Sequence, residues 1–212
     1  MPAQATLNYL ALGDSYTIGT GATTPARAFP ALLVPRLETQ LRSPVQLTNP
    51  AVNGYTTADL IREELPLLRS RPDLVSVLIG ANDVVQGWPL DRYRDNLAAI
   101  YESVLAAGVP GPAVLAVSVP DWSSTPAAGQ FGAPAVLRAQ LEAVNAVARR
   151  EAEERGMLFA DVVPISRRSE AGWLSDDGLH PSEAQYAAWA QAIWTAQGER
   201  WAAAVRDERA AS

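Results

Sequence analysis

The chain alternates short, continuously apolar runs with longer stretches in which apolar residues recur every three or four positions. Continuous apolarity favours a strand that is buried on both faces, whereas the longer spacing favours an amphipathic helix. The predicted strands are residues 7–12, 45–52, 73–79, 113–119 and 157–163. The predicted helices are residues 28–42, 57–70, 91–107, 134–155 and 182–205.

This regular alternation of strands and helices predicts an α/β protein with a parallel, doubly wound sheet. Gly and Pro concentrate at residues 108–112 and 120–134, which we interpret as loops. Neither an internal repeat nor a linker divides the sequence. We therefore expect one domain over residues 1–212.

Polar residues that could take part in catalysis or binding follow four of the predicted strands. In chain order they are Ser15, the pair Asn53 and Gly54, the pair Asn82 and Asp83, and the group Asp176, Asp177 and His180. Ligands of open α/β sheets bind beyond the carboxyl ends of the strands. The first three groups are therefore expected on one rim if their strands are neighbours.

Each group also has a purely structural explanation. Ser and Asp are favoured helix caps, which would account for Ser15. Asn53 and Asp177 each precede a glycine, a combination typical of turns, and Asn82 could simply begin a helix. A lone His before Pro is often a loop residue. Their joint position favours a site, and we interpret Ser15 as a nucleophile that also caps the following helix.

The composition excludes most kinds of catalytic site other than one built from serine or carboxylate residues. The 212 residues include no Cys, no Lys among 17 basic residues, and one His. This excludes disulfides, cysteine nucleophiles, Schiff-base chemistry and multi-histidine zinc sites. Carboxylate chemistry and a serine paired with the single imidazole remain possible.

The net charge and the hydropathy of the sequence limit the classes of partner that the protein can bind. A net charge of −6 argues against nucleic acid, which a clustered basic face would favour. No apolar run reaches the roughly 18 residues of a membrane span, so no integral membrane association is expected. The first residues show no basic region followed by a separate apolar region, so we expect a cytoplasmic protein without a signal peptide. The sequence does not indicate the oligomeric state.

A reactive serine needs a base, and the base needs a group that fixes its tautomer. His180 can be the base for Ser15, and Asp177, three residues earlier, can reach the far ring nitrogen within one turn. Asp176 is the competing assignment, although its side chain should leave the opposite side of an extended turn.

Acyl transfer also needs hydrogen-bond donors for the developing oxyanion. The candidates are the backbone N–H groups of Ser15 and Gly54 and the side-chain amide of Asn82.

Four motifs together resemble the ordered blocks of the GDSL or SGNH hydrolases. They are "GDSY" with Ser15, "NGYTT" with Gly54, "GAND" with Asn82, and "DGLHP" with Asp177 and His180. The resemblance implies a flavodoxin-like three-layer α/β/α sandwich with a five-stranded parallel sheet. It implies ester hydrolysis through a serine acyl-enzyme without metal or organic cofactor, with Ser15, Asp177 and His180 as the triad. It also implies that Ser15, Gly54 and Asn82 form the oxyanion hole.

Two positions depart from common patterns. Tyr16 stands where the family name has Leu, which leaves Ser15 in place. Thr17 stands two residues after Ser15 where a lipase box has Gly, so this is not the nucleophile elbow of an α/β-hydrolase.

The sequence does not identify the substrate. The chain has little room for a lid domain, which favours small or short-chain esters. Trp88, Trp122 and Phe131 are candidates for the substrate pocket, although ordinary packing explains them equally well. Acyltransferase, thioesterase, lysophospholipase and carbohydrate deacetylase activities would use the same residues. A non-enzymatic flavodoxin-like binding module for a small molecule is the alternative of another class, and a metal site at Asp176, Asp177 and His180 is a weaker one.

Overall fold

The fold is organised around one parallel β-sheet. The structure is a computed structural model that describes residues 5–211, with side chains described to residue 206. Within these residues the strands are β1 (Leu7–Gly13), β2 (Val45–Thr48), β3 (Leu74–Leu78), β4 (Val114–Val117) and β5 (Leu158–Ala160). They are parallel and lie in the order β2-β1-β3-β4-β5. All five predicted strands are confirmed, although β2 ends before Pro50, which lacks the N–H that the ladder requires.

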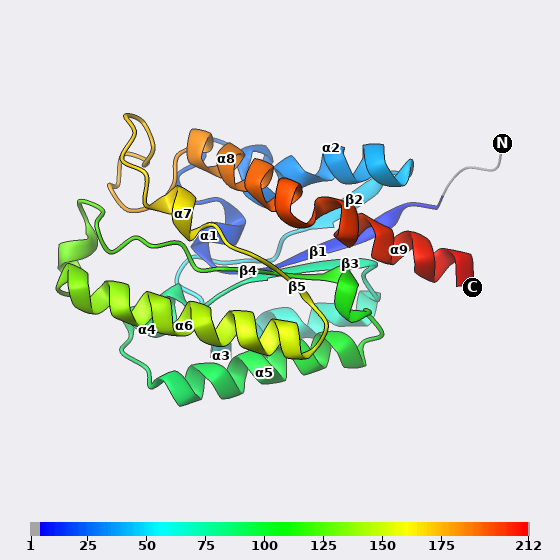
Figure 1. Cartoon of the computed structure of the whole chain (residues 1–212), viewed down its shortest axis with the longest axis horizontal. Coiled ribbons are helices and arrows are strands. Elements are labelled where there is room, and N and C mark those ends of the chain that lie inside the picture. Colours follow the sequence, from blue (N-terminus) through cyan, green and yellow to red (C-terminus); the bar gives the residue numbers. More distant parts are fainter. Residues whose placement is uncertain (1–4, 212) are drawn as a thin grey trace.

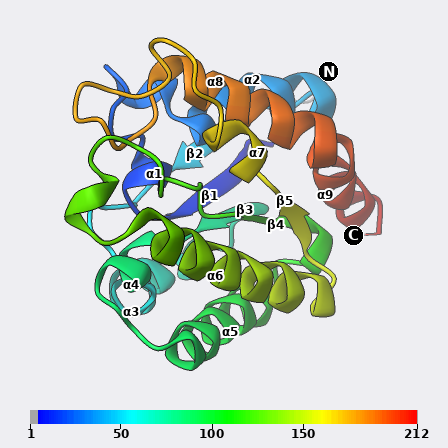
Figure 2. The same ribbon diagram turned by 60° about the vertical axis from the view of Figure 1, so that its left-hand side comes forward.

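Helices cover both faces of the sheet, giving the three-layer arrangement that the sequence predicts (Figures 1 and 2). One face carries α2 (Phe29–Leu41), α8 (Glu183–Ile193) and α9 (Glu199–Ala211). The other carries α3 (Thr57–Asp59), α5 (Leu90–Ala106) and α6 (Pro134–Glu154). Three short helices directly follow strands or their loops: α1 (Ser15–Ile18), α4 (Ala81–Val85) and α7 (Val163–Ser166).

The helix predicted over residues 57–70 has three parts. After α3 the chain continues as a π-helical segment, Leu60–Glu64, and then as a 3₁₀ segment, Leu65–Ser70. Pro66 lies at the start of the 3₁₀ segment, where its missing N–H and its ring interrupt regular α-helical hydrogen bonding. A similar π-helical segment, Trp194–Gly198, joins α8 to α9. The helical stretches are therefore confirmed, and their local geometry differs from a regular α-helix.

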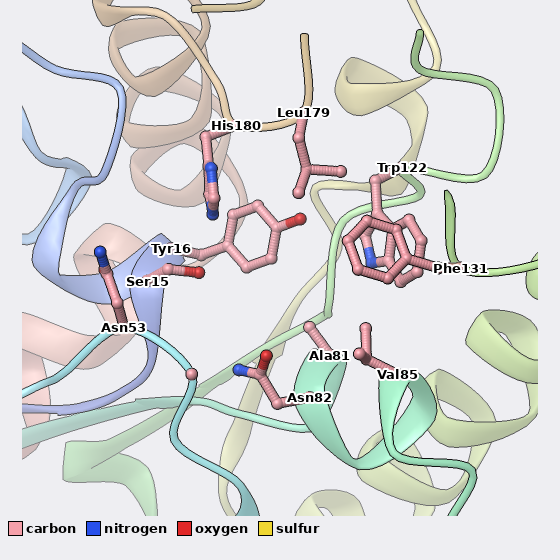
Figure 3. Close-up of a pocket in the computed structure, with 11 residues that line it drawn as sticks. Ser15, Tyr16, Asn53, Ala81, Asn82, Val85, Trp122, Phe131, Leu179 and His180 are labelled. Carbon is pink, nitrogen blue, oxygen red and sulfur yellow. The ribbon is translucent and has the colours of Figure 1, made fainter. Parts of the chain in front are cut away.

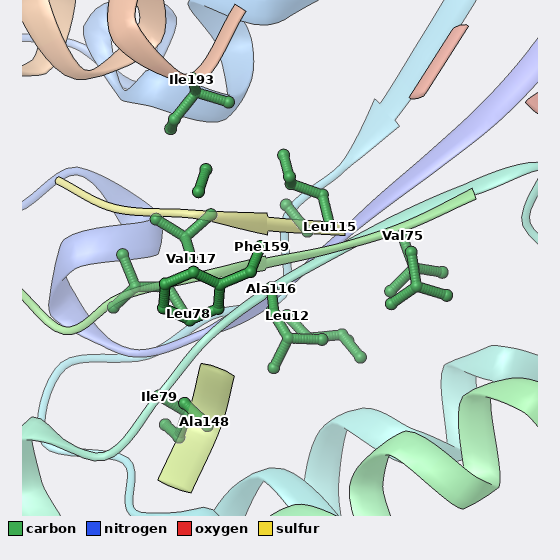
Figure 4. Close-up of a cluster of buried hydrophobic side chains, with 14 of the residues drawn as sticks. Leu12, Val75, Leu78, Ile79, Leu115, Ala116, Val117, Ala148, Phe159 and Ile193 are labelled. Carbon is green, nitrogen blue, oxygen red and sulfur yellow. The ribbon is translucent and has the colours of Figure 1, made fainter. Parts of the chain in front are cut away.

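The core is apolar on both faces of the sheet. Side chains of the central strands, among them Leu12, Val75 and Leu115, are fully or almost fully buried. Figure 4 shows them between Ile193 from α8 and Ala148 from α6. Burying one such aliphatic side chain contributes roughly 1.5–3 kcal/mol. The strand ends at the candidate site are therefore held in place by a firmly packed core.

The strand order places the candidate groups together. β1 lies between β2 and β3, so the strand order reverses direction at β1. Binding sites of doubly wound sheets occur at such a switch point, beyond the carboxyl ends. The segments after β1, β2 and β3 begin with or contain Ser15, Gly54 and Asn82 respectively, as the sequence predicts.

Candidate active site

Ser15 lies in a tight turn between β1 and α1. The turn needs glycine at position 13, because a Cβ atom there would lie 2.2 Å from Thr17 Oγ1 and 2.3 Å from the carbonyl oxygen of Leu78. Asp14 caps α1, since its Oδ1 accepts a hydrogen bond from the Tyr16 N–H at 3.0 Å. The prediction that Ser15 also caps this helix is therefore wrong. The Asp14 carboxyl group fills that role, so the hydroxyl of Ser15 is not needed as the cap.

The turn before α8 holds Asp177 against His180. Asp177 Oδ2 lies 2.6 Å from His180 Nδ1. The other oxygen, Oδ1, accepts hydrogen bonds from the N–H groups of Leu179 and His180 and from the Ser175 hydroxyl, at 2.8–2.9 Å. Partial burial opposes the charge of Asp177, but these hydrogen bonds outweigh it and hold the pKa of Asp177 well below its ordinary value. Asp177 is thus an ionised acceptor that orients the imidazole. Both aspartates are exposed, and it is Asp177, not Asp176, that contacts the ring of His180.

Ser15 and His180 line the same cavity, which has a volume of about 150 Å³. Figure 3 shows the ring of His180 directed toward Ser15. The ring of Tyr16 packs beside the imidazole, with 5.5 Å between the ring centroids. The serine near one end of the chain and the histidine near the other therefore lie on the same cavity.

Gly54 and Asn82 also line this cavity. Gly54 has a φ of 85°, a conformation that favours glycine, and a Cβ atom there would meet no atom within 4 Å. Asn82 Nδ2 donates a hydrogen bond to the carbonyl oxygen of Tyr55 at 2.9 Å, which leaves its second N–H for another acceptor. Asn53, the residue before Gly54, lines the cavity too and accepts a hydrogen bond from the Thr20 hydroxyl.

Asp83, at the start of α4, binds the segment that contains Gly54. Its two carboxyl oxygens accept hydrogen bonds from the Thr57 N–H at 3.0 Å and the Thr57 hydroxyl at 2.5 Å. Burial raises the pKa of Asp83, and these hydrogen bonds partly oppose the rise. Because Asn82 and Asp83 bind consecutive parts of that loop, the segments after β2 and β3 form one unit.

Aromatic side chains form the far wall of the cavity. Trp122 and Phe131 contact each other edge to face, with 5.5 Å between ring centroids, and Val85 and Leu179 complete the apolar lining. Trp122 is buried, whereas Phe131 is 39% exposed. Asp121 anchors the segment before Trp122 by accepting a hydrogen bond from Arg167 Nε at 2.6 Å. One aromatic wall residue is thus fixed and the other lies at the surface.

The sequence matches the model of the GDSL-like lipase/acylhydrolase family over residues 11–188. The chain belongs to this family. The matched range contains every residue of the cavity described above.

Related proteins agree with the family assignment. A lipase from Streptomyces rimosus is 27% identical over 195 residues, covering 75% of this chain and 70% of the lipase. The family 3 carbohydrate esterase of Clostridium thermocellum superimposes with a TM-score of 0.73 at 18% identity, covering 94% of this chain and 98% of the esterase. The psychrotrophic esterase EstA from a Pseudoalteromonas species has a TM-score of 0.69 at 18% identity, covering 89% and 95% of the two chains. At these identities the two structures show that the fold is shared.

Trp88, a candidate for the substrate pocket, does not line the cavity of Ser15. Trp88 lies on a second cavity of about 190 Å³, together with Asp83, Val84 and Tyr93. The guanidinium of Arg92 lies 3.5 Å from the centroid of the Trp88 ring. The short helix α4 explains the difference, because Asn82 and Val85 line the first cavity while Asp83 and Val84 line the second.

Sequence reasoning missed four other lining residues of the GDSL-like site. They are Tyr16, Ala81, Val85 and Leu179. Tyr16 and Leu179 are neighbours of Ser15 and His180, and the other two lie beside Asn82. All four lie within or close to a motif, but the motifs point to polar groups, and the apolar wall carries no comparable signal in the sequence.

The described residues contain neither a candidate metal site nor a candidate membrane-spanning helix. Among them, no group of three or more His, Cys, Asp or Glu side chains is arranged to hold a metal ion, so the alternative of a metal site at Asp176, Asp177 and His180 receives no support. No helix in the described part of the chain combines the length and apolar character needed to cross a membrane.

Proposed function

We propose that the protein is a serine esterase that hydrolyses small carboxylic esters through Ser15, His180 and Asp177. The observation that carries the proposal is the convergence of Ser15 and His180 on one cavity, with Asp177 2.6 Å from the far ring nitrogen. A serine hydroxyl becomes nucleophilic when a base takes its proton, and an oriented carboxylate fixes that base in the required tautomer.

In the proposed cycle, Ser15 Oγ attacks the ester carbonyl while His180 Nε2 accepts its proton. The tetrahedral intermediate collapses, His180 protonates the leaving alcohol, and the acyl group remains on Ser15. A water molecule, deprotonated by His180, then releases the acid. Asp177 stays ionised and stabilises the imidazolium that forms twice in the cycle.

The oxyanion of each tetrahedral intermediate needs preorganised donors. The Asn82 amide, with one N–H engaged by Tyr55 and the other unused by that bond, supports a role as one donor. The backbone N–H of Gly54 is a second donor, because the space around the Gly54 α-carbon is open to a substrate. The N–H of Ser15 is the third. Neutral donors suit a site that carries the negative charge only transiently.

The size and lining of the cavity support a small substrate. A protein cavity of about 150 Å³ with apolar walls accommodates a group as large as benzene. The wall formed by Trp122, Phe131, Val85 and Leu179 suits the acyl or alcohol part of such an ester.

The test is hydrolysis of p-nitrophenyl acetate by Ser15→Ala. We expect kcat to fall by about 10⁴-fold or more, with an unchanged circular dichroism spectrum. Ser103→Ala is the matched control, because Ser103 is a helical serine of α5 that does not line this cavity, and it should retain normal activity. Substantial turnover by Ser15→Ala would remove the proposal.

A further inference from the structure

Two buried carboxyl groups lie behind the candidate nucleophile and have no role in the proposed cycle. Asp14 precedes Ser15 in the turn after β1, and Glu64 comes from the π-helical segment that follows α3. Asp14 is 0% exposed and Glu64 is 1% exposed. Burying an ionised carboxylate without compensation is strongly unfavourable, so this arrangement requires an explanation.

Each carboxyl group uses one oxygen to hold the backbone of the same turn. Glu64 Oε2 accepts a hydrogen bond from the Gly13 N–H at 2.9 Å. Asp14 Oδ1 accepts one from the Tyr16 N–H at 3.0 Å. The two acceptors therefore bind the residues on either side of the Asp14–Ser15 pair. The position of Ser15 depends on both.

The second oxygen of each group is buried without a hydrogen-bond partner. These atoms are Asp14 Oδ2 and Glu64 Oε1. Carboxylate oxygens only accept, so two carboxylates cannot satisfy each other, whereas a carboxylic acid and a carboxylate can. Glu64 binds the N–H of the residue before Asp14, and the charge of Asp14 raises the pKa of Glu64, so the two carboxyl groups are close enough to interact.

The surroundings offer no positive charge to replace a proton. Neither Asp14 nor Glu64 forms an ion pair with any residue in the described part of the chain. The other groups coupled to Asp14 are Asp83 and three buried phenols, Tyr16, Tyr93 and Tyr186. Burial raises the pKa of Asp14 to about 8 and that of Glu64 to about 8, and the charge of Asp14 contributes to the second rise. Such a cluster favours retention of a proton at neutral pH.

We propose that Asp14 and Glu64 share one proton between Asp14 Oδ2 and Glu64 Oε1, and that this acid–carboxylate pair positions Ser15. The proton satisfies both unpartnered oxygens and leaves one negative charge on the pair. Two carboxyl groups that share a proton titrate as a unit, so the values near 8 describe the pair. The positioning role rests on the proposed function of Ser15, whereas the shared proton does not.

Loss of the shared proton has a defined consequence. Two like charges then lie in a buried site without a counter-ion, and their repulsion acts on the hydrogen bonds to Gly13 and Tyr16. Ser15 moves away from its position relative to His180, and turnover falls. With one titration near pH 8, kcat/KM falls by up to about tenfold between pH 7 and pH 9.

Infrared spectroscopy of the intact protein tests the proton itself. The wild-type protein at pH 7 is expected to show the C=O stretch of a buried carboxylic acid, which disappears as the pair titrates. Glu64→Gln and Asp14→Asn should both lack this band, because an amide N–H then replaces the shared proton. Glu151→Gln should keep it, since Glu151 is a buried carboxylate paired with Arg155 on α6. Absence of the band in wild type, or its persistence in both pair variants, overturns the shared proton.

The pH dependence of kcat/KM for p-nitrophenyl acetate tests the positioning role. Wild type and Glu151→Gln should decline above pH 8, and Glu64→Gln should stay level, because its amide has no proton to lose in this range. Equal alkaline decline in all three proteins overturns the positioning role. Should Glu64→Gln fail to fold, Asp14→Asn serves the same comparison. A failure of Ser15 as nucleophile would appear in Ser15→Ala and would leave the infrared result unaffected.

Discussion

At the scale of single residues, adjacent side chains of similar chemistry have different tasks. Asp14 and Ser15 are both good cap residues, and the sequence does not tell which one caps α1. The backbone decides, because Asp14 has the extended conformation of a cap and Ser15 is the first helical residue. The sequence predicts the presence of Ser15 at the site, but the division of labour with Asp14 required coordinates.

Asp176 and Asp177 provide a second adjacent pair and a direct test. Asp177→Asn should lower kcat for p-nitrophenyl acetate by about 10⁴-fold, because an amide favours the wrong tautomer of the imidazole. Asp176→Asn, its matched control, should remain within a fewfold of wild type, since Asp177 and not Asp176 contacts the His180 ring. Steady-state kinetics of both variants measure the contrast. The reverse order of effects would transfer the role to Asp176.

At the scale of elements, the short helix α4 separates two cavities. Its residues Asn82 and Val85 line the cavity of Ser15, and Val84 lines the one beside Trp88. The pattern of apolar residues identified the longer helices, but a five-residue helix is too short to show a period. For this reason the sequence could not separate Trp88, which lies on the second cavity, from Trp122 and Phe131, which lie on the candidate site.

The aromatic wall predicts how acyl length is limited. Phe131→Ala opens the exposed side of the cavity, so its preference among p-nitrophenyl esters should shift by about tenfold toward longer acyl chains, about 1.4 kcal/mol in relative kcat/KM. Trp88→Ala should leave the chain-length profile of the wild-type protein unchanged, because Trp88 lies on the second cavity. A panel of esters from acetate to octanoate measures both. An unchanged profile in Phe131→Ala would show that this wall does not contact the acyl chain.

At the scale of the whole molecule, the order of the strands creates the site. Hydrophobic patterning located the five strands but not their neighbours, because strand order depends on long-range pairing. The order β2-β1-β3 brings three loops to one rim, and the chain returns from β5 to add His180. The four motifs predicted this convergence through family resemblance, and patterning alone did not.

The shared proton also predicts the pH dependence of global stability. Asp14 and Glu64 have pKa values raised to about 8, above the unfolded values of about 4. Between these values the folded state binds more protons than the unfolded state, so the free energy of unfolding falls as pH rises. Because the proposed pair holds a single shared proton, the folded state binds one extra proton, and the slope is about −1.4 kcal/mol per pH unit.

Urea denaturation at several pH values from 5 to 8 measures this slope. The free energy of unfolding of Glu64→Gln should depend on pH less steeply than that of wild type, by the slope that one bound proton contributes. Glu151→Gln should follow wild type. Parallel curves for wild type and Glu64→Gln would contradict a proton held by this pair.

Covalent labelling with an organophosphonate followed by peptide mass analysis tests the central claim most directly. Cleavage after arginine yields a peptide of residues 1–27 in which Ser15 is the single serine. We predict one phosphonyl group on Ser15 in the wild-type protein and none on this peptide in Ser15→Ala. Modification at another residue together with loss of esterase activity, or equal labelling of Ser15→Ala, would contradict Ser15 as the nucleophile.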